Sequence, residues 1–242
     1  MTRTGRLVGV GVGPGDPELV TVKGVRALQQ SDVVFVPVGD TGETGRAEAV
    51  TLAYVPGSKV RRITFALAGD AAKREESWDR AGAAVAEVVA AGRSAAFATL
   101  GDPAVYSTFS YLAATVRALV GDVAVETVPG VTAMQDLAAR SGTVLVEGGE
   151  RLALLPLAAG TRRLEEALAG FDTVVCYKGG RHLPEIVDTL RRAGRLERAV
   201  YGARLGLPDE IVQPATKLGG EAGPYLSTVI VLPDRPARGS KL

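Results

Sequence analysis

The sequence is poor in the residues that build disulfides and metal centres. Cys176 is its single cysteine and His182 its single histidine in 242 residues. One cysteine cannot form an intramolecular disulfide or a zinc site with several thiolates. A single histidine gives little support to a histidine-centred catalytic triad and cannot form a histidine-rich metal site. We therefore expect no metal held by protein ligands.

An excess of charge and a long hydrophobic run are also missing. Lys and Arg number 28 against 27 Asp and Glu, a formal net charge of +1, which gives no support to nucleic-acid binding through phosphate neutralisation. No stretch approaches the ~20 apolar residues that span a bilayer, and residues 1–6 lead into a short apolar segment unlike the core of a signal peptide. We expect a cytoplasmic protein with neither a nucleic-acid nor a membrane partner.

Apolar residues are plentiful at 46% of the chain, and they alternate between strand-like and helix-like patterns. The expected strands cover residues 7–12, 33–36, 59–63 (an edge strand), 94–100, 123–128, 152–155, 173–177, 198–201 and 226–232. The expected helices cover residues 16–30, 71–91, 107–119, 132–140, 162–168 and 182–193, and residues 39–45 are expected to form a surface loop. This alternation predicts an α/β fold with a parallel sheet.

Two chain breakers, Pro129 and Gly130, follow the fifth expected strand. They place a domain boundary there and predict two α/β domains, residues 1–129 and 130–242. A cleft between two such domains is a common place for a ligand.

A glycine-rich loop, Gly9–Pro17, follows the first expected strand. It does not fit the dinucleotide fingerprint, because Pro14 and Asp16 fall where the third glycine should be, and no Gly-Lys-Ser/Thr follows to make a phosphate-binding P-loop. Its glycines and prolines predict a tight turn with little side-chain bulk, which lets a ligand approach the main chain. The alternative is a plain turn between a strand and a helix.

Two further loops, Leu100–Thr108 and Val128–Ala133, also lie between an expected strand and an expected helix. Asp102 in the second loop is a candidate helix cap or a ligand contact, and Thr132 in the third is a candidate cap. Three such loops at the carboxyl ends of parallel strands outline one rim of a sheet, where α/β proteins bind ligands.

These loops carry a resemblance to a known family. Gly11–Leu19, Gly101-Asp102-Pro103 with Tyr106-Ser107-Thr108, and Pro129–Thr132 resemble the three signature loops of the tetrapyrrole methylases. Tyr106–Leu112, Lys178–Arg181 and Tyr225–Val231 resemble segments of the precorrin-2 / cobalt-factor-2 C20-methyltransferase branch. The matches keep their order and span nearly the whole chain.

The resemblance implies a two-domain α/β methyltransferase, usually a homodimer, that holds S-adenosylmethionine between its domains and methylates carbon 20 of precorrin-2 in cobalamin biosynthesis. Carried over position by position, the cofactor contacts fall on Pro14, Leu100, Gly101, Asp102, Val105, Thr132, Ala133 and Lys178, with Ser227 and Thr228 as additions. Lys178 departs from the wider family, which often has methionine there. A lysine beside a sulfonium is electrostatically unfavourable, so we expect a backbone contact at this position.

The implied substrate carries many carboxylates, which guanidinium groups bind well. The candidate substrate-binding residues are Arg46, Arg61, Arg62, Arg181 and Tyr106, and Tyr177 is a further candidate for the wall of the site. No residue is assigned as a catalytic acid or base. We expect His182 to begin a helix and Cys176 to be an inert core residue.

Several alternatives stay open. The substrate is either metal-free precorrin-2 or cobalt-factor-2. A related enzyme of the same family acts at another ring carbon or on the diphthamide precursor of a translation factor. A protein of a different class, a non-catalytic module that senses a nucleotide or a tetrapyrrole, would use the same glycine loops.

Overall fold

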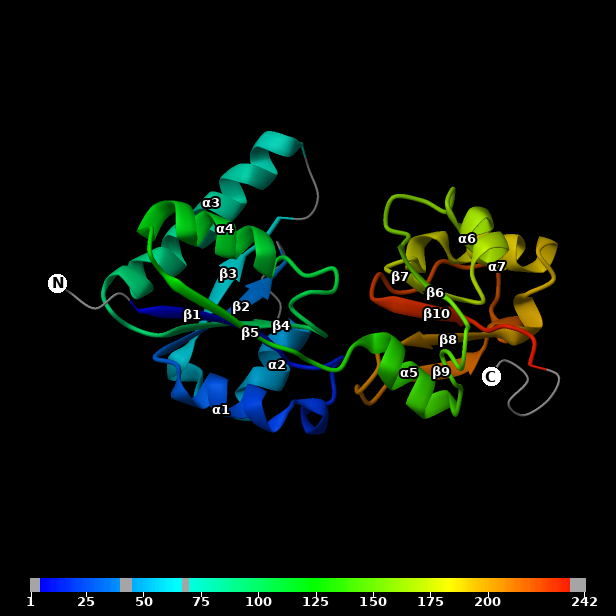
Figure 1. Ribbon diagram of the computed structural model, residues 1–242, viewed down its shortest axis with the longest axis horizontal. Helices are drawn as coiled ribbons and strands as arrows, with labels where there is room; N and C mark the ends of the chain where they lie inside the picture. The colour runs from blue at the N-terminus through cyan, green and yellow to red at the C-terminus, as the bar shows by residue number, and fades with distance from the viewer. Residues whose placement is uncertain (1–4, 40–44, 67–69, 236–242) are drawn as a thin grey trace. The chain divides into compact units, whose positions relative to one another are not determined.

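The computed structural model describes residues 5–39, 45–66 and 70–235, and it divides into two compact units. The first unit runs to Thr132 and the second begins at Ala133, slightly beyond the breakers Pro129 and Gly130. The expected α/β class is confirmed, since each unit has one five-stranded sheet with helices on it (Figure 1). The centre of the expected surface loop, residues 40–44, lies outside the described residues.

The first unit has a fully parallel sheet with the strand order β3-β2-β4-β1-β5. Its strands are β1 Arg6–Gly11, β2 Val33–Val38, β3 Val60–Thr64, β4 Ala95–Thr99 and β5 Ala124–Val128. Its helices are α1 Val22–Gln30, α2 Arg46–Leu52, α3 Ala71–Ala90 and α4 Phe109–Val120. Consecutive residues of β1 point to opposite faces, so Leu7 packs in the core under α3 and α4 while Val8 packs in the core under α1 and α2 (Figure 1). Burial of both faces explains why the inner strands β1, β2 and β4 are almost continuously apolar, whereas the edge strands β3 and β5 carry charged residues.

The structure corrects the first expected helix, which does not begin at Asp16. Pro17–Leu19 form a single 3-10 turn capped by Asp16, and Val20 is extended. A new helix, α1, begins at Val22, because the Thr21 hydroxyl accepts a hydrogen bond from the Gly24 N–H at 3.0 Å. Asp16 and Thr21 each cap the start of a separate segment, and the extended Val20 lies between the two segments, so one continuous helix does not form.

Three other expectations change in detail. The second strand was expected to end before Pro37, but β2 runs through it to Val38 beside the edge strand β3, because a proline removes only the one N–H it lacks. The short elements α2 and β9 (Ile211–Pro214) were not expected.

The second unit has a mixed sheet with the order β6-β7-β10-β8-β9. Its remaining strands are β6 Leu152–Pro156, β7 Thr173–Tyr177, β8 Ala199–Ala203 and β10 Ser227–Val231; its helices are α5 Ala133–Ser141, α6 Leu164–Gly170 and α7 Leu183–Arg192. Within the described residues, β6 and β7 are the one parallel pair of adjacent strands in this sheet, and β10 runs antiparallel to both of its neighbours, β7 and β8. A parallel return needs a crossover of about a dozen residues or more, usually a helix, and the chain between β8 and β10 carries only β9 and one 3-10 turn.

Helices cover both faces of this second sheet. α6 and α7 pack on one face, and α5 packs on the other (Figure 1). The apolar stripe expected on the last helix is confirmed, because Leu183, Ile186, Val187 and Leu190 of α7 are all buried. None of the helices within the described residues is long and apolar enough to cross a membrane.

Candidate functional site

The three glycine loops meet at one edge of the first sheet. β1 lies between β4 and β5 in a parallel sheet, so the loops that follow these three strands are neighbours. The Gly101 N–H donates to the Gly13 carbonyl at 2.7 Å, and the Val12 N–H donates to the Thr99 carbonyl at 3.0 Å. The expected rim of loops is therefore confirmed within this unit, and we call Val12–Asp16, Leu100–Asp102 and Pro129–Thr132 the glycine rim.

Gly11, the last residue of β1, and Gly130 of the rim are required to be glycine by close packing of the main chain. A Cβ atom on Gly11 would lie 2.5 Å from the Gly101 carbonyl oxygen and 2.6 Å from the Gly130 nitrogen. A Cβ atom on Gly130 would lie 2.7 Å from the Gly11 carbonyl carbon and nearer still to the Gly101 oxygen. No side chain fits between these backbones, so the residues set how closely the three loops approach one another.

Gly101 has a different reason to be glycine. Its φ of +72° is in the left-handed region, which side chains disfavour, yet a Cβ atom there would meet none of the described protein atoms within 4 Å. The space beside the α carbon of Gly101 is thus not filled by the described protein atoms.

Asp102 holds the second loop against the third. One carboxylate oxygen accepts a hydrogen bond from the Ala104 N–H at 2.7 Å, and the other accepts from the Gly130 N–H at 2.9 Å. The capping interpretation of Asp102 is wrong, because α4 begins only at Phe109. The carboxylate fixes loop geometry and brings a negative charge to the rim.

The other first-unit cofactor candidates line the same loops. Pro14 and Thr132 are buried, whereas Leu100 and Val105 are half-buried. Tyr106 is 40% exposed and has a φ of +50°. A bulky residue in this left-handed conformation is unusual and points to a constraint at this loop.

The second unit gathers its candidates where β7 ends and β10 begins. Thr228 pairs with Tyr177, and the Lys178 N–H donates to the Ser227 carbonyl at 3.2 Å. Ser227 and Thr228 are buried, and Ala133 is the first residue of α5. Lys178 has a φ of +57°, and burial lowers the pKa of its ammonium group.

Tyr177 is better described as a core residue than as a wall of a site. Its side chain is buried, and its hydroxyl accepts a hydrogen bond from the Met134 N–H of α5 at 3.2 Å. Cys176 is buried as expected, and burial raises the pKa of its thiol to about 12. His182 stands at the N-cap of α7, also as expected.

The candidate arginines are distributed over both units. Arg61 and Arg62 lie in the middle of edge strand β3, with β2 and β4 between it and β1. The Arg62 guanidinium binds both oxygens of the buried Glu48 carboxylate, at 2.9 and 3.0 Å. Arg46 begins α2, and Arg181 is exposed in the turn after β7.

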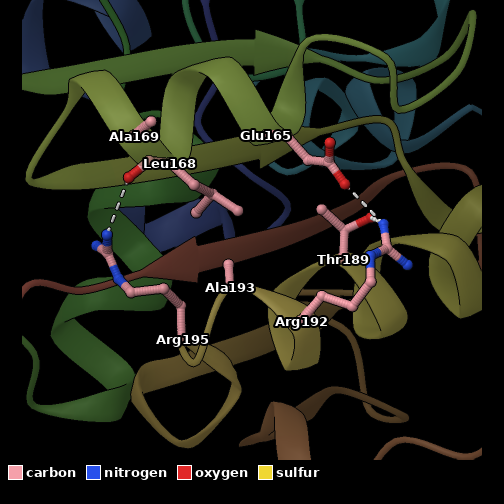
Figure 2. Close-up of a pocket in the computed structure, with 7 residues that line it drawn as sticks. All are labelled: Glu165, Leu168, Ala169, Thr189, Arg192, Ala193 and Arg195. Atoms are coloured by element: carbon pink, nitrogen blue, oxygen red, sulfur yellow. Dashed lines mark hydrogen bonds and ion pairs between the residues drawn. The ribbon is translucent and has the colours of Figure 1, made fainter.

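A separate pocket of about 350 Å³ lies between α6 and α7 (Figure 2). Its lining residues are Glu165, Leu168, Ala169, Thr189, Arg192, Ala193 and Arg195. The Arg195 guanidinium donates to the carbonyls of Leu168, Asp172 and Leu232 at 3.2, 2.6 and 3.1 Å. Arg192 pairs with Glu165 at 2.7 Å (Figure 2). Asp172 precedes β7 and Lys178 follows it, so the pocket lies at the other end of that strand from the candidate site.

These features define a class of protein: a two-unit α/β protein with glycine-rich loops at the carboxyl ends of the strands of its first sheet. Within that class the chain belongs to the tetrapyrrole (corrin/porphyrin) methylases, whose family model matches residues 6–219. The resemblance seen in the loop sequences is thereby confirmed.

Two curated relatives match over most of their length. The chain is 36% identical over 243 residues to a precorrin-2 C(20)-methyltransferase of Sinorhizobium sp, covering 96% of this chain and 98% of the relative. It is 31% identical over 207 residues to a cobalt-precorrin-2 C(20)-methyltransferase of Salmonella typhimurium, covering 85% and 86%.

Solved structures share the fold. The uroporphyrin-III C-methyl transferase of Thermus thermophilus, complexed with S-adenyl homocysteine, superposes with a TM-score of 0.65 at 27% identity and covers 94% of this chain and 97% of its own. The methyltransferase CobJ gives a TM-score of 0.68 at 19% identity, with 98% of each chain covered.

Proposed function

We propose that this protein is an S-adenosylmethionine-dependent methyltransferase that methylates carbon 20 of precorrin-2 in cobalamin biosynthesis. The observation that carries the proposal is the 36% identity to a precorrin-2 C(20)-methyltransferase across nearly the full length of both chains. The glycine rim and the likeness to a methyltransferase complexed with S-adenyl homocysteine support the choice of cofactor.

The rim fits such a cofactor on physical grounds. A bulky ligand that is recognised through main-chain groups needs close backbone approach, and Gly101 leaves its α carbon uncovered by described protein atoms. The proposed cofactor contacts are Pro14, Leu100, Gly101, Asp102, Val105 and Thr132 from the first unit and Ala133, Lys178, Ser227 and Thr228 from the second.

S-adenosylmethionine, when bound, supplies a methyl group already activated on a positively charged sulfur. The protein then has mainly to bind, orient and bring the reacting groups close. Asp102 contributes to the orientation indirectly, because its hydrogen bond from the Ala104 N–H shapes the second loop and its hydrogen bond from the Gly130 N–H holds that loop against the third. Its negative charge favours a cation at the rim. Burial lowers the pKa of the Lys178 ammonium group, and we propose that this residue contacts the cofactor through its backbone.

The carboxylates of the substrate call for cationic partners, and we assign these to Arg46, Arg61, Arg62 and Arg181, with Tyr106 as a contact of the ring. Arg61 and Arg181 are both exposed, whereas Arg62 already binds the carboxylate of Glu48. Arg181 also follows Lys178 by three residues, close in the chain to the proposed cofactor contacts of the second unit, so we take it as the strongest of the four. We also propose that the enzyme is a cytoplasmic homodimer.

The direct test is incubation of the purified protein with precorrin-2 and S-adenosylmethionine carrying a ¹³C-labelled methyl group. The expected product is heavier by one methyl group, with the label at carbon 20 by NMR. A label at another carbon would identify a different branch of the family, and binding without any turnover would identify a non-catalytic module.

A competition between metal-free precorrin-2 and cobalt-factor-2 tests whether the substrate contains cobalt. We propose the metal-free substrate, which the name of the 36% identical relative supports, while the 31% identical relative is named for the cobalt form. A kcat/KM at least tenfold higher for cobalt-factor-2, or about 1.4 kcal/mol in transition-state free energy, would reverse the assignment.

A further inference from the structure

Two loops of the second unit are joined by their backbones beside Lys178. The Gly223 N–H donates to the Gly180 carbonyl at 2.8 Å. A Cβ atom on Gly180 would lie 2.5 Å from the Pro224 carbonyl carbon, so the two loops leave no room for a side chain between them. The segment after β7 and the segment before β10 therefore form one fixed surface.

A buried tyrosine lies under this surface. A Cβ atom on Gly223 would lie 2.7 Å from the Tyr201 hydroxyl oxygen. Tyr201 is 3% exposed, and its hydroxyl is hydrogen-bonded to the Ser227 side chain. The position of the Gly223 segment is thus set from below by packing and from the side by the Gly180 hydrogen bond.

Three large side chains remain accessible on the joined loops. Tyr225 is 38% exposed, Leu226 is 37% exposed, and Arg181 is exposed, although the adjoining strand β10 is completely buried. The Arg181 charge is close enough to act on the Tyr225 phenol, whose pKa is nevertheless raised because burial outweighs that charge. Tyr225 therefore stays a neutral hydrogen-bond donor at physiological pH.

We propose that Tyr225 and Leu226, together with Arg181, form a substrate subsite that binds one carboxylate-bearing edge of the tetrapyrrole. The Tyr225 ring and Leu226 provide an apolar contact for the macrocycle. The Tyr225 O–H and the Arg181 guanidinium both donate to one peripheral carboxylate, an arrangement of two donors that suits this group. This inference rests on the proposed function, and it names Tyr225 and Leu226 as residues that determine substrate affinity.

The chain offers a matched control at the other end of β7 from the proposed subsite. Arg151 and Phe171 are also an exposed cation and aromatic ring, with the guanidinium carbon 5.7 Å from the ring centre, and they lie just before β6 and β7. The substitutions Arg181→Gln, Tyr225→Phe and Leu226→Ala are compared with Arg151→Gln and Phe171→Leu.

Two measurements separate the subsite from the chemistry. Steady-state kinetics with precorrin-2 should show KM raised roughly tenfold by Arg181→Gln and about fivefold by Tyr225→Phe, with the affinity for S-adenosylhomocysteine unchanged. The affinity for uroporphyrin III, an octacarboxylate tetrapyrrole, measured by fluorescence titration, should fall by similar factors in these variants. The affinity for its octamethyl ester should not change with Arg181→Gln. The control variants should match the wild type in every assay.

The outcomes distinguish the two proposals. Normal KM values and normal uroporphyrin III affinity in folded Arg181→Gln and Tyr225→Phe variants would overturn the subsite, even if the enzyme methylates precorrin-2. If the wild type fails to methylate precorrin-2 but its uroporphyrin III binding still depends on Arg181 and Tyr225, the subsite stands and the proposed reaction is wrong.

Discussion

Replacement of Gly130 by alanine should damage both the stability of the first unit and its binding of the cofactor. The new Cβ atom would lie 2.7 Å from the carbonyl carbon and 2.8 Å from the α carbon of Gly11, where ordinary contact begins near 3.4 Å. These are main-chain atoms, which cannot rotate away as a side chain can. The third loop must therefore move away from the first by about 0.7 Å, and by more from the Gly101 carbonyl oxygen of the second loop, which lies nearest to the new atom.

The size of the effect follows from the interactions that this movement strains. Overpacking a tight interior costs about 1–3 kcal/mol. The same shift weakens the hydrogen bond from the Gly130 N–H to the Asp102 carboxylate, worth about 1–2 kcal/mol. We expect the free energy of unfolding to fall by about 2–4 kcal/mol, which a typical domain survives. The displaced rim should bind S-adenosylhomocysteine at least about tenfold more weakly.

Urea denaturation and isothermal titration calorimetry measure the two quantities separately. Gly149→Ala is the control, because Gly149 is exposed, a Cβ atom there meets none of the described atoms within 4 Å, and its φ lies outside the left-handed region. It should change the free energy of unfolding by less than about 0.5 kcal/mol. Wild-type stability of Gly130→Ala would refute the backbone packing of the rim. Reduced stability with unchanged S-adenosylhomocysteine affinity would refute the rim as the cofactor site.

Three further changes test other parts of the argument. Gly101→Val should lower the free energy of unfolding by only about 1–2 kcal/mol, from the left-handed φ, but should abolish the rise in melting temperature that S-adenosylhomocysteine gives the wild type; a normal rise would move the cofactor elsewhere. Arg195→Ala should lower the free energy of unfolding measured in urea by about 2–4 kcal/mol, because three carbonyls lose their donor. The control Arg192→Ala, which breaks an exposed ion pair, should lower it by less than about 1 kcal/mol; equal effects would contradict a stabilising role for the Arg195 hydrogen bonds. Burial raises the pKa of the Cys176 thiol from 9.0 to about 12, so the native protein should resist iodoacetamide at pH 8 and the unfolded protein should react; rapid alkylation of the native protein would show that Cys176 is accessible. The contribution of this thiol to stability should fall as the pH rises above about 9, because there only the thiol of the unfolded chain ionises.

Local features of the sequence were sufficient to find the loops of the site. Glycine and proline at the ends of apolar strands restrict the backbone wherever they occur, so Gly101 and Gly130 could be singled out from their neighbours in the chain alone. The buried stripe of α7 was equally readable, because helical periodicity is a property of consecutive residues. The order of these motifs also carried the resemblance to the tetrapyrrole methylases, which the family match confirms.

The tertiary structure decided which of these segments meet. Because β1 lies between β4 and β5, the three loops that follow these strands form one rim. The same strand order brings the Gly130 N–H to the Asp102 carboxylate, although the two residues are 28 positions apart in the chain. The antiparallel β10 brings Tyr225 beside Arg181, a proximity that no local pattern encodes. The sequence determines what each segment prefers to be through interactions between near neighbours. Strand order and contacts between distant segments depend instead on how whole sheets bury their apolar faces, and that is settled only when the chain is packed.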